Sequence, residues 1–219
     1  MKRYLPFAII VVVFLVSAGA GTAVFFWRQR AEPAKSVPEG GKPGAQPAHT
    51  LGSPDARVKI EEFGDFQCPS CAALSPALIQ AEQKYRGRIC VIFRQFPLAS
   101  HKHALAAASA AEAAGLLGRF WQMHDLLYGS QLLWSKAEDV REFFNQFAKS
   151  LGLDVERFKI EAESEQVKAR IIADQQRAAS LGVNRTPAIF IAGGRLPDTS
   201  LNQKALQEAI DAAVKQKAR

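Results

Sequence analysis

Two cysteines three positions apart, Cys68 and Cys71, constrain the fold of this chain more than any other feature. They lie in the run C-P-S-C, directly after residues 57–63 (RVKIEEF), whose near alternation of apolar and charged side chains predicts a β-strand. Residues 72–85 follow and carry apolar side chains at helical spacing. A C-x-x-C that follows a strand and opens a helix is typical of a redox site, so the sequence predicts a dithiol in an α/β domain.

The spacing of the pair has a chemical consequence. Across the first turn of a helix, residues three apart bring their Cβ atoms close enough for a disulfide. The first cysteine lies where unpaired N–H groups and the positive end of the helix dipole favour a thiolate, which lowers its pKa. Pro69 suits the first helical position, where a missing N–H costs nothing. We therefore expect Cys68 to be the nucleophile and Cys71 to resolve the mixed disulfide.

A zinc site is the main structural alternative for a C-x-x-C, and it requires a second pair of ligands. The remaining candidates form no such pair beyond a weak H-x-H: Cys90, His101, His103 and His124. We interpret these histidines as belonging to a solvated helix start, and Cys90, in an apolar strand, as a buried core thiol. The sequence predicts neither a metal nor another cofactor. A metal-binding or chaperone-like module that uses the C-x-x-C and a histidine stays open as an alternative.

Two further features are expected at the same site. Thr186-Pro187 directly precedes an apolar strand, a place where a proline can begin a strand. A cis peptide bond between Thr186 and Pro187 would expose a backbone edge to an incoming peptide. The sequence leaves open whether this bond is cis or trans. An acid pointing inward from the strand before the motif would have a raised pKa and could accept the proton of Cys71. Glu61 and Glu62 are the candidates, and adjacent residues point to opposite faces.

Beyond the motif, the chain alternates strands with a long helical block. Residues 88–94 and 187–192 read as strands, the latter followed by a Gly193-Gly194 turn and a paired strand. Helical patterns cover residues 103–115, 120–127, 139–151, 167–181 and 203–215. This order fits an α/β sheet with a helical insertion.

The N-terminus predicts a membrane segment. From Leu5 to Trp27 no side chain is charged, and a helix of that length spans about 34 Å, enough for a bilayer core. We favour an uncleaved anchor at residues 1–30 over a cleaved signal peptide, which stays open; both predict export of the remainder. Residues 31–50, rich in Pro, Gly and Ala, are expected to form a semi-extended linker, with the folded domain at residues 51–219.

The net charge of +7 is concentrated at that N-terminus. Residues 1–30 hold four basic and no acidic side chains, which leaves 24 basic against 21 acidic residues in the rest of the chain. No basic stripe with interleaved aromatic residues follows. The sequence therefore predicts no nucleic-acid partner.

Four stretches of the chain carry a resemblance to a known family: residues 62–71 (EFGDFQCPSC), 93–98 (FRQFPL), 120–127 (FWQMHDLL) and 181–187 (LGVNRTP). Together they resemble the DsbA-like thioredoxin-fold family over residues 51–216. The resemblance implies an α/β thioredoxin fold with an all-helical domain inserted at about residues 100–181. It also implies that the protein is a thiol–disulfide oxidoreductase.

The resemblance also assigns site residues. It implies that Cys68 attacks and that Cys71 is its partner. Pro187 falls on the family's cis-proline, with Thr186 beside it, and Pro69 and Ser70 complete the expected substrate contacts. Glu62 falls on the family's buried acid, which favours it over Glu61. The strongest oxidants of the family have His where this chain has Ser70, so we expect a less lowered Cys68 pKa and a weaker oxidant, an effect to which Asp65 would add.

The expected function is disulfide exchange with exported proteins. We expect an oxidase at the bacterial cytoplasmic membrane, with its catalytic domain on the periplasmic side, acting as a monomer on unfolded or thiol-containing proteins. By family analogy, a quinone-linked membrane partner would reoxidise it. The alternative within the same chemistry is a reductase or isomerase kept reduced by an electron donor. The substrate, the redox partner and the direction of electron flow are not defined by the sequence.

Overall fold

A computed structural model describes residues 41–198 and 201–217. Within these residues a sheet has the strand order β1-β3-β2-β4-β5. β2 and β3 are parallel, whereas β1 is antiparallel to β3, β4 to β2 and β5 to β4. The strands are β1 His49–Gly52, β2 Val58–Gly64, β3 Ile89–Gln95, β4 Ala188–Ile191 and β5 Gly194–Arg195.

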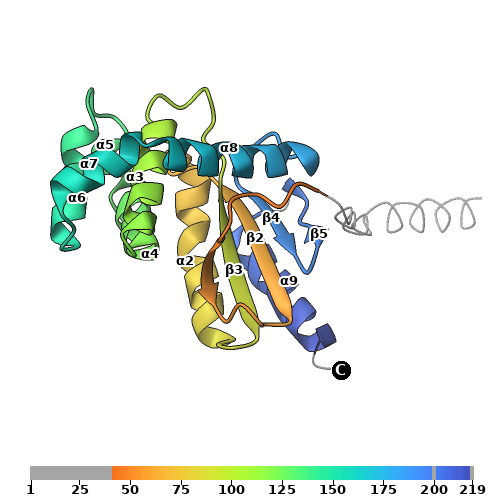
Figure 1. Cartoon of the computed structure of the whole chain (residues 1–219). Coiled ribbons are helices and arrows are strands. Elements are labelled where there is room, and N and C mark those ends of the chain that lie inside the picture. The colour runs from red at the N-terminus through yellow and green to blue at the C-terminus, as the bar shows by residue number, and fades with distance from the viewer. Residues whose placement is uncertain (1–40, 199–200, 218–219) are drawn as a thin grey trace, which may run out of the picture. The chain divides into compact units, whose positions relative to one another are not determined.

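Two helices cover one face of the sheet (Figure 1). Parallel β2 and β3 require a crossover connection, and α2 (Pro69–Lys84) supplies it. The C-terminal helix α9 (Gln203–Lys217) packs beside α2. The apolar contacts come from alternate positions of the strands and one stripe of each helix, and include Ile60, Val91, Ile189, Leu74, Leu78, Leu206 and Ile210.

The other face of the sheet is covered by α8 (Glu165–Ser180), which runs from the helical insertion across to the strands (Figure 1). Ala178 of α8 packs on Phe63 of β2 and on Phe190 of β4. Because β2 is covered on both faces, nearly all of its side chains are buried. Alternation in its sequence therefore does not separate a core face from a solvent face.

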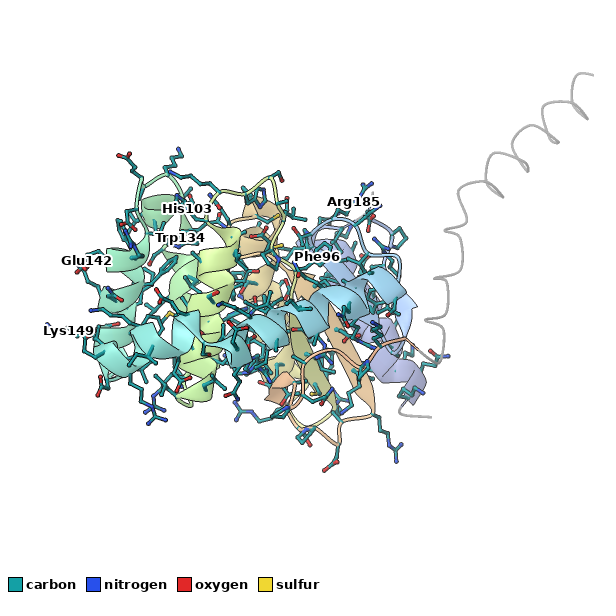
Figure 2. All side chains as sticks on the ribbon, turned by 45° about the horizontal axis from the view of Figure 1, so that its top comes forward. Phe96, His103, Trp134, Glu142, Lys149 and Arg185 are labelled. Carbon is teal, nitrogen blue, oxygen red and sulfur yellow. The ribbon has the colours of Figure 1, made fainter. Side chains whose placement is uncertain are left out.

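The expected helical insertion at about residues 100–181 is confirmed. Its helices are α3 Ala104–Leu116, α4 Phe120–Gly129, α5 Gln131–Trp134, α6 Arg141–Ser150, α7 Val155–Glu163 and α8. The sequence did not predict α5 or α7. Trp134 is completely buried inside this insertion, while Phe96 and Arg185 lie toward the sheet (Figure 2).

Residues 41–50 differ from the solvated linker that the sequence predicts there. Ala45 is buried, its N–H donates to Asp174 Oδ1 at 2.8 Å, and its carbonyl accepts from Arg94 Nη1 at 2.8 Å. Arg170 donates to the carbonyls of Gln46 and Pro47. The segment therefore packs through its main chain, with charged partners from distant elements, and β1 begins before the expected boundary at residue 51.

The expected membrane anchor at residues 1–30 and the first part of the linker, residues 31–40, lie outside the described residues. Among the described helices, none has the length and apolar character needed to cross a bilayer.

Candidate active site

Cys68 and Cys71 lie at the N-terminus of α2, as the sequence predicts. Cys68 has an extended backbone (φ −75°, ψ 120°) and directly precedes the helix, with Pro69 at its start. Both cysteines are free thiols in this structure. Cys68 retains 6% of its surface exposed and Cys71 none, while Pro69 and Ser70 between them are exposed. The first sulfur is thus at the surface edge of the site and the second is inside it.

The environment of Cys68 favours a thiolate. A hydrogen bond from the Cys71 thiol is the largest of several effects that lower the pKa of Cys68 to about 5, against the opposing effect of burial. Thr186 and the main-chain N–H groups of Cys71 and Ser70 act in the same direction. The contribution of Ser70 comes from its main-chain N–H group.

Cys71 is held as a neutral thiol. Burial is the main cause that raises the pKa of Cys71 well above its ordinary value, followed by its hydrogen bond to Cys68 and the charge of Glu62. The two cysteines therefore differ in ionisation although they are one helical turn apart. At neutral pH one is a nucleophile and the other is not.

Glu62 is the acid on the dithiol side of the sheet. Its side chain is 1% exposed and its Oε1 has no hydrogen-bond partner among the described residues. Burial, followed by the charge of Cys68, raises the pKa of Glu62 to about 8. Glu61 points to the opposite face and pairs with Arg94 at 2.8 Å and Arg177 at 2.6 Å. The choice of Glu62 over Glu61 agrees with this geometry.

Thr186 and Pro187 complete the group around the cysteines. The bond between them is cis, and Pro187 is buried directly before β4. The Cys68 sulfur lies 3.6 Å from the Thr186 carbonyl oxygen. Thr186 Oγ1 is buried without a hydrogen-bond partner in the described part of the protein. The structure therefore gathers all of the site residues expected from the sequence: Cys68, Cys71, Glu62, Thr186, Pro187, Pro69 and Ser70.

A family model described as thioredoxin matches residues 45–212, nearly all of the domain just described. The chain belongs to the thioredoxin family. Within it, the chain shares its fold with alpha-DsbA1 of Wolbachia pipientis, which is 20% identical, with a TM-score of 0.65 over 78% of this chain and 92% of that one.

Solved structures agree with the family. A thioredoxin-like oxidoreductase from Silicibacter pomeroyi DSS-3 is 27% identical, with a TM-score of 0.65 over 77% of this chain and 92% of that one. BdbD from Bacillus subtilis is 23% identical, with a TM-score of 0.70 over 84% of this chain and 100% of that one, and it supports the fold.

Among curated proteins, the chain is 34% identical over 152 residues to an Na(+)/H(+) antiporter NhaA 1 from Mycolicibacterium gilvum. The match covers 67% of this chain but 24% of the antiporter. The chain thus spans about a quarter of the length of the curated relatives it matches.

Two glutamines connect this thioredoxin-family site to the helical insertion by hydrogen bonds. Sequence patterns did not single them out. Gln131 of α5, 5% exposed, donates from Nε2 to the carbonyls of Phe66 at 2.7 Å and Cys68 at 3.0 Å. Gln67 donates to the carbonyl of Ser135 at 3.0 Å and accepts from the main-chain N–H of His103 at 2.6 Å. No local signal marks these residues, because each acts on main-chain groups of a distant segment.

Asp65 is turned away from the cysteines. Its carboxylate contacts the main-chain N–H of Gln67 at 2.7 Å and that of Leu98 at 3.0 Å, and His101 Nδ1 at 2.7 Å. It therefore fixes the loop between β3 and α3 on the motif. The expected direct effect of this carboxylate on Cys68 is not among the effects that set the Cys68 pKa.

The expectation of solvated histidines is wrong for two of the three. His103 is 6% exposed, with Nε2 2.8 Å from the carbonyl of Ala137. His124 is 2% exposed and packs among aromatic rings. His101 is partly exposed. Cys90 is completely buried in β3, as expected. Among the described residues, no group of three or more Cys, His, Asp or Glu side chains could hold a metal ion.

Proposed function

We propose that this protein exchanges a Cys68–Cys71 disulfide with the thiols of exported proteins, as an oxidase in disulfide-bond formation. The observation that carries the proposal is the opposite ionisation of the two cysteines. The pKa of Cys68 is lowered to about 5, while burial raises that of Cys71 well above its ordinary value. A stabilised thiolate favours the reduced enzyme and so makes its disulfide a stronger oxidant.

The reaction begins on the disulfide form. A substrate thiolate attacks the Cys68 sulfur, a bond forms between them, and the Cys68–Cys71 bond breaks. Cys71 leaves with the electron pair and takes a proton from Glu62, whose pKa is raised chiefly by burial, a cause that persists when Cys68 carries no charge. A second substrate thiolate then attacks the substrate sulfur and releases Cys68 as a thiolate. The substrate has lost two electrons and the enzyme has gained them.

Glu62 serves both directions of this exchange. In the direction above it donates its proton to Cys71, and in the reverse direction its carboxylate accepts the proton of the Cys71 thiol. A pKa near the working pH suits a group that must do both. This role requires that Glu62 be the acid of β2 that faces the dithiol, which its burial and the unpartnered Oε1 among the described residues support.

The exposed edge of the site is the proposed binding surface for substrate. Pro69 and Ser70 are exposed beside Cys68, and the segment Thr186-Pro187 approaches the Cys68 sulfur, with the Thr186 carbonyl oxygen at 3.6 Å. An extended peptide with a cysteine could lie between these two segments. Thr186 Oγ1, which has no partner among the described residues, is available to donate to the Cys68 thiolate.

We further propose that the domain works outside the cytoplasm, held at the membrane through residues 1–30, as a monomer. The uncharged run from Leu5 to Trp27 supports the anchor. A dithiol that must return to the disulfide needs an electron acceptor, for which we propose a quinone-linked membrane protein. A structurally similar thioredoxin-like protein from Salmonella enterica is described as periplasmic, which agrees with this location.

The test is oxidation of a reduced, unfolded model protein by the purified disulfide form. Cys68→Ser should abolish oxidation, because the variant cannot form the Cys68–Cys71 disulfide that the substrate thiolate attacks. In the reverse direction, the Cys68 thiolate of Cys71→Ser should attack the disulfide of an oxidised substrate and accumulate a mixed disulfide, because no second enzyme thiol is left to displace the substrate. Cys90→Ser is the matched control and should keep full activity, since Cys90 is buried away from the motif. Undiminished oxidation by Cys68→Ser would end the proposal.

A further inference from the structure

Tyr128 of α4 is buried beside the dithiol, and its hydroxyl has no hydrogen-bond partner among the described residues. The residue is 7% exposed. Its ring lies 4.8 Å from that of Phe66 and 4.9 Å from that of His124. A phenylalanine would keep these ring contacts without burying an unpartnered hydroxyl, which is unfavourable. The hydroxyl therefore requires an explanation other than packing.

The hydroxyl lies against the strand that carries Glu62. A Cβ atom on Gly64 would come within 2.9 Å of the Tyr128 oxygen, so the bare backbone of Gly64 makes room for it. Gly64 and Glu62 are two residues apart in β2 and therefore face the same side of the sheet. Gln95 pairs with Gly64 in β3 and shares that side.

Four buried side-chain atoms of the described residues have no hydrogen-bond partner. They are Glu62 Oε1, Gln95 Oε1, Tyr128 OH and Thr186 Oγ1. Three of the four, those of Glu62, Gln95 and Tyr128, belong to the face of the sheet where Tyr128 meets β2. Buried polar atoms are normally satisfied by protein or by ordered water, and a water needs two to four such partners. These unpartnered atoms are suited to holding one such water molecule.

The other acids near Tyr128 already have partners. Burial first, and then the charges of Cys71, Glu62, Asp65 and Cys68, raise the pKa of Tyr128 well above its ordinary value. Asp65 is occupied by Gln67, Leu98 and His101. On α4 itself, His124 Nδ1 is 2.9 Å from Asp125. Of the two nearby carboxyl groups, Glu62 is the one with an unpartnered oxygen.

We propose that Tyr128 is a positioning residue for proton transfer, whose hydroxyl donates through one buried water to Glu62 when Glu62 has lost its proton. This inference rests on the proposed function, in which Glu62 exchanges a proton with Cys71. After Glu62 gives its proton to the departing Cys71 thiolate, a buried carboxylate remains. The Tyr128 hydroxyl, which keeps its own proton, stabilises that carboxylate until the proton returns.

The test is the ionisation of Glu62 in the reduced protein, followed by carbon-13 NMR of its carboxyl group. Tyr128→Phe should raise the pKa of Glu62 by about 1 to 2 units, the effect of losing one hydrogen bond to the ionised form. The pH profile for resolution of a Cys68 mixed disulfide by Cys71 should shift by the same amount. Tyr85→Phe is the matched control, because Tyr85 donates its hydroxyl to Asp211, away from the site. Tyr85→Phe should change neither the pKa of Glu62 nor the pH profile of mixed-disulfide resolution.

A second measurement needs no tyrosine variant. The Cζ carbon signal of Tyr128 in the wild-type protein should shift as Glu62 ionises, and Glu62→Gln should remove that step. An unchanged Glu62 pKa in folded Tyr128→Phe, or a Tyr128 signal indifferent to Glu62→Gln, would overturn the inference. Neither titration involves a substrate, so failure here is distinct from failure of the oxidation assay with Cys68→Ser.

Discussion

Cys68 and Glu62 oppose each other's ionisation: after burial, the charge on Cys68 is the second cause that raises the pKa of Glu62 to about 8. Cys68 is shifted in the other direction, to about 5. At neutral pH the reduced site therefore holds one negative charge, on Cys68, beside a mainly neutral carboxyl group. Oxidation removes the thiolate and with it one of the causes that keep Glu62 protonated.

The stability of the reduced and oxidised proteins should therefore depend differently on pH. Between about pH 5 and 9 the unfolded chain binds a Cys68 proton that the folded reduced protein lacks, so stability rises with pH by up to about 1.4 kcal/mol per unit. Glu62 acts with the opposite sign between 4.5 and about 8, because the folded state holds the extra proton. These contributions offset each other in the reduced protein. The oxidised protein keeps only that of Glu62 and should lose stability as pH rises through this range.

Urea unfolding of both forms from pH 5 to 8 measures the difference. Glu62→Gln provides the control. The stability of its reduced form should rise with pH, and the stability of its oxidised form should no longer fall as pH rises. Parallel pH curves for reduced and oxidised wild-type protein would show that the two ionisations are not shifted as described.

Alkylation of the reduced protein should report the hydrogen bond between the cysteines. Cys68 should react with a half-maximal rate near pH 5, while buried Cys71 stays unreactive in the native state. Cys71→Ala removes the largest cause of the lowered pKa and should raise it by about one to two units, as expected for a hydrogen bond to a charged group. Cys71→Ser retains a donor and should restore part of the effect. Equal profiles for Cys71→Ala and wild type would contradict this account.

The reduction potential of the Cys68–Cys71 couple should be near −220 mV. The pKa of the attacking cysteine is about 7 in thioredoxin and about 3.5 in DsbA, so a value of about 5 is intermediate. At pH 7 the greater ionisation relative to thioredoxin stabilises the reduced form by about 2 kcal/mol, which shifts the potential by about 50 mV from −270 mV. Titration against a glutathione buffer measures it. A potential at or below that of thioredoxin would favour the reductase alternative over the oxidase.

The dithiol and its strand–helix setting could be predicted because the signal is local: two cysteines, a proline at the helix start and short periodic segments on each side. The choice between Glu61 and Glu62 could not be made from alternation, since both faces of β2 are buried. Only the resemblance favoured Glu62. The cis state of the bond before Pro187 likewise has no local sequence signature.

What the sequence missed depends on partners far along the chain. Gln131 acts through the carbonyls of Phe66 and Cys68, more than sixty residues away. Residues 41–50 have the composition of a linker, yet Arg94, Arg170 and Asp174 bind their main-chain groups. Composition describes what a segment can bury through its own side chains. It does not describe which charged groups the rest of the fold brings to its backbone.

Gly64 should tolerate no side chain. A Cβ atom there would lie 2.6 Å from the Phe93 ring and 2.9 Å from the Tyr128 hydroxyl. Gly64→Ala should lower the free energy of unfolding by about 1–3 kcal/mol, as overpacking does in a core. Gly129→Ala, at the end of α4 with open space around it, is the control and should be neutral or slightly stabilising. Urea unfolding compares them, and equal stabilities would show that the packing around Gly64 relaxes freely.

Asp174 should be essential for holding residues 41–50 on the domain. Its carboxylate, 1% exposed, accepts from the N–H groups of Ala45 at 2.8 Å and Gln95 at 3.0 Å and from Arg94 at 3.1 Å. Asp174→Ala would leave a buried guanidinium and two N–H groups without this partner, a change that typically costs about 3–5 kcal/mol.

The matched control on the same helix is Lys168→Ala, because Lys168 forms only an exposed ion pair with Glu165 and should contribute less than about 1 kcal/mol. Hydrogen exchange at the Ala45 amide gives a second readout. That amide should lose its protection in Asp174→Ala and keep it in Lys168→Ala. If both variants unfolded at the same urea concentration with Ala45 still protected, the segment would have to be held by the arginine contacts alone.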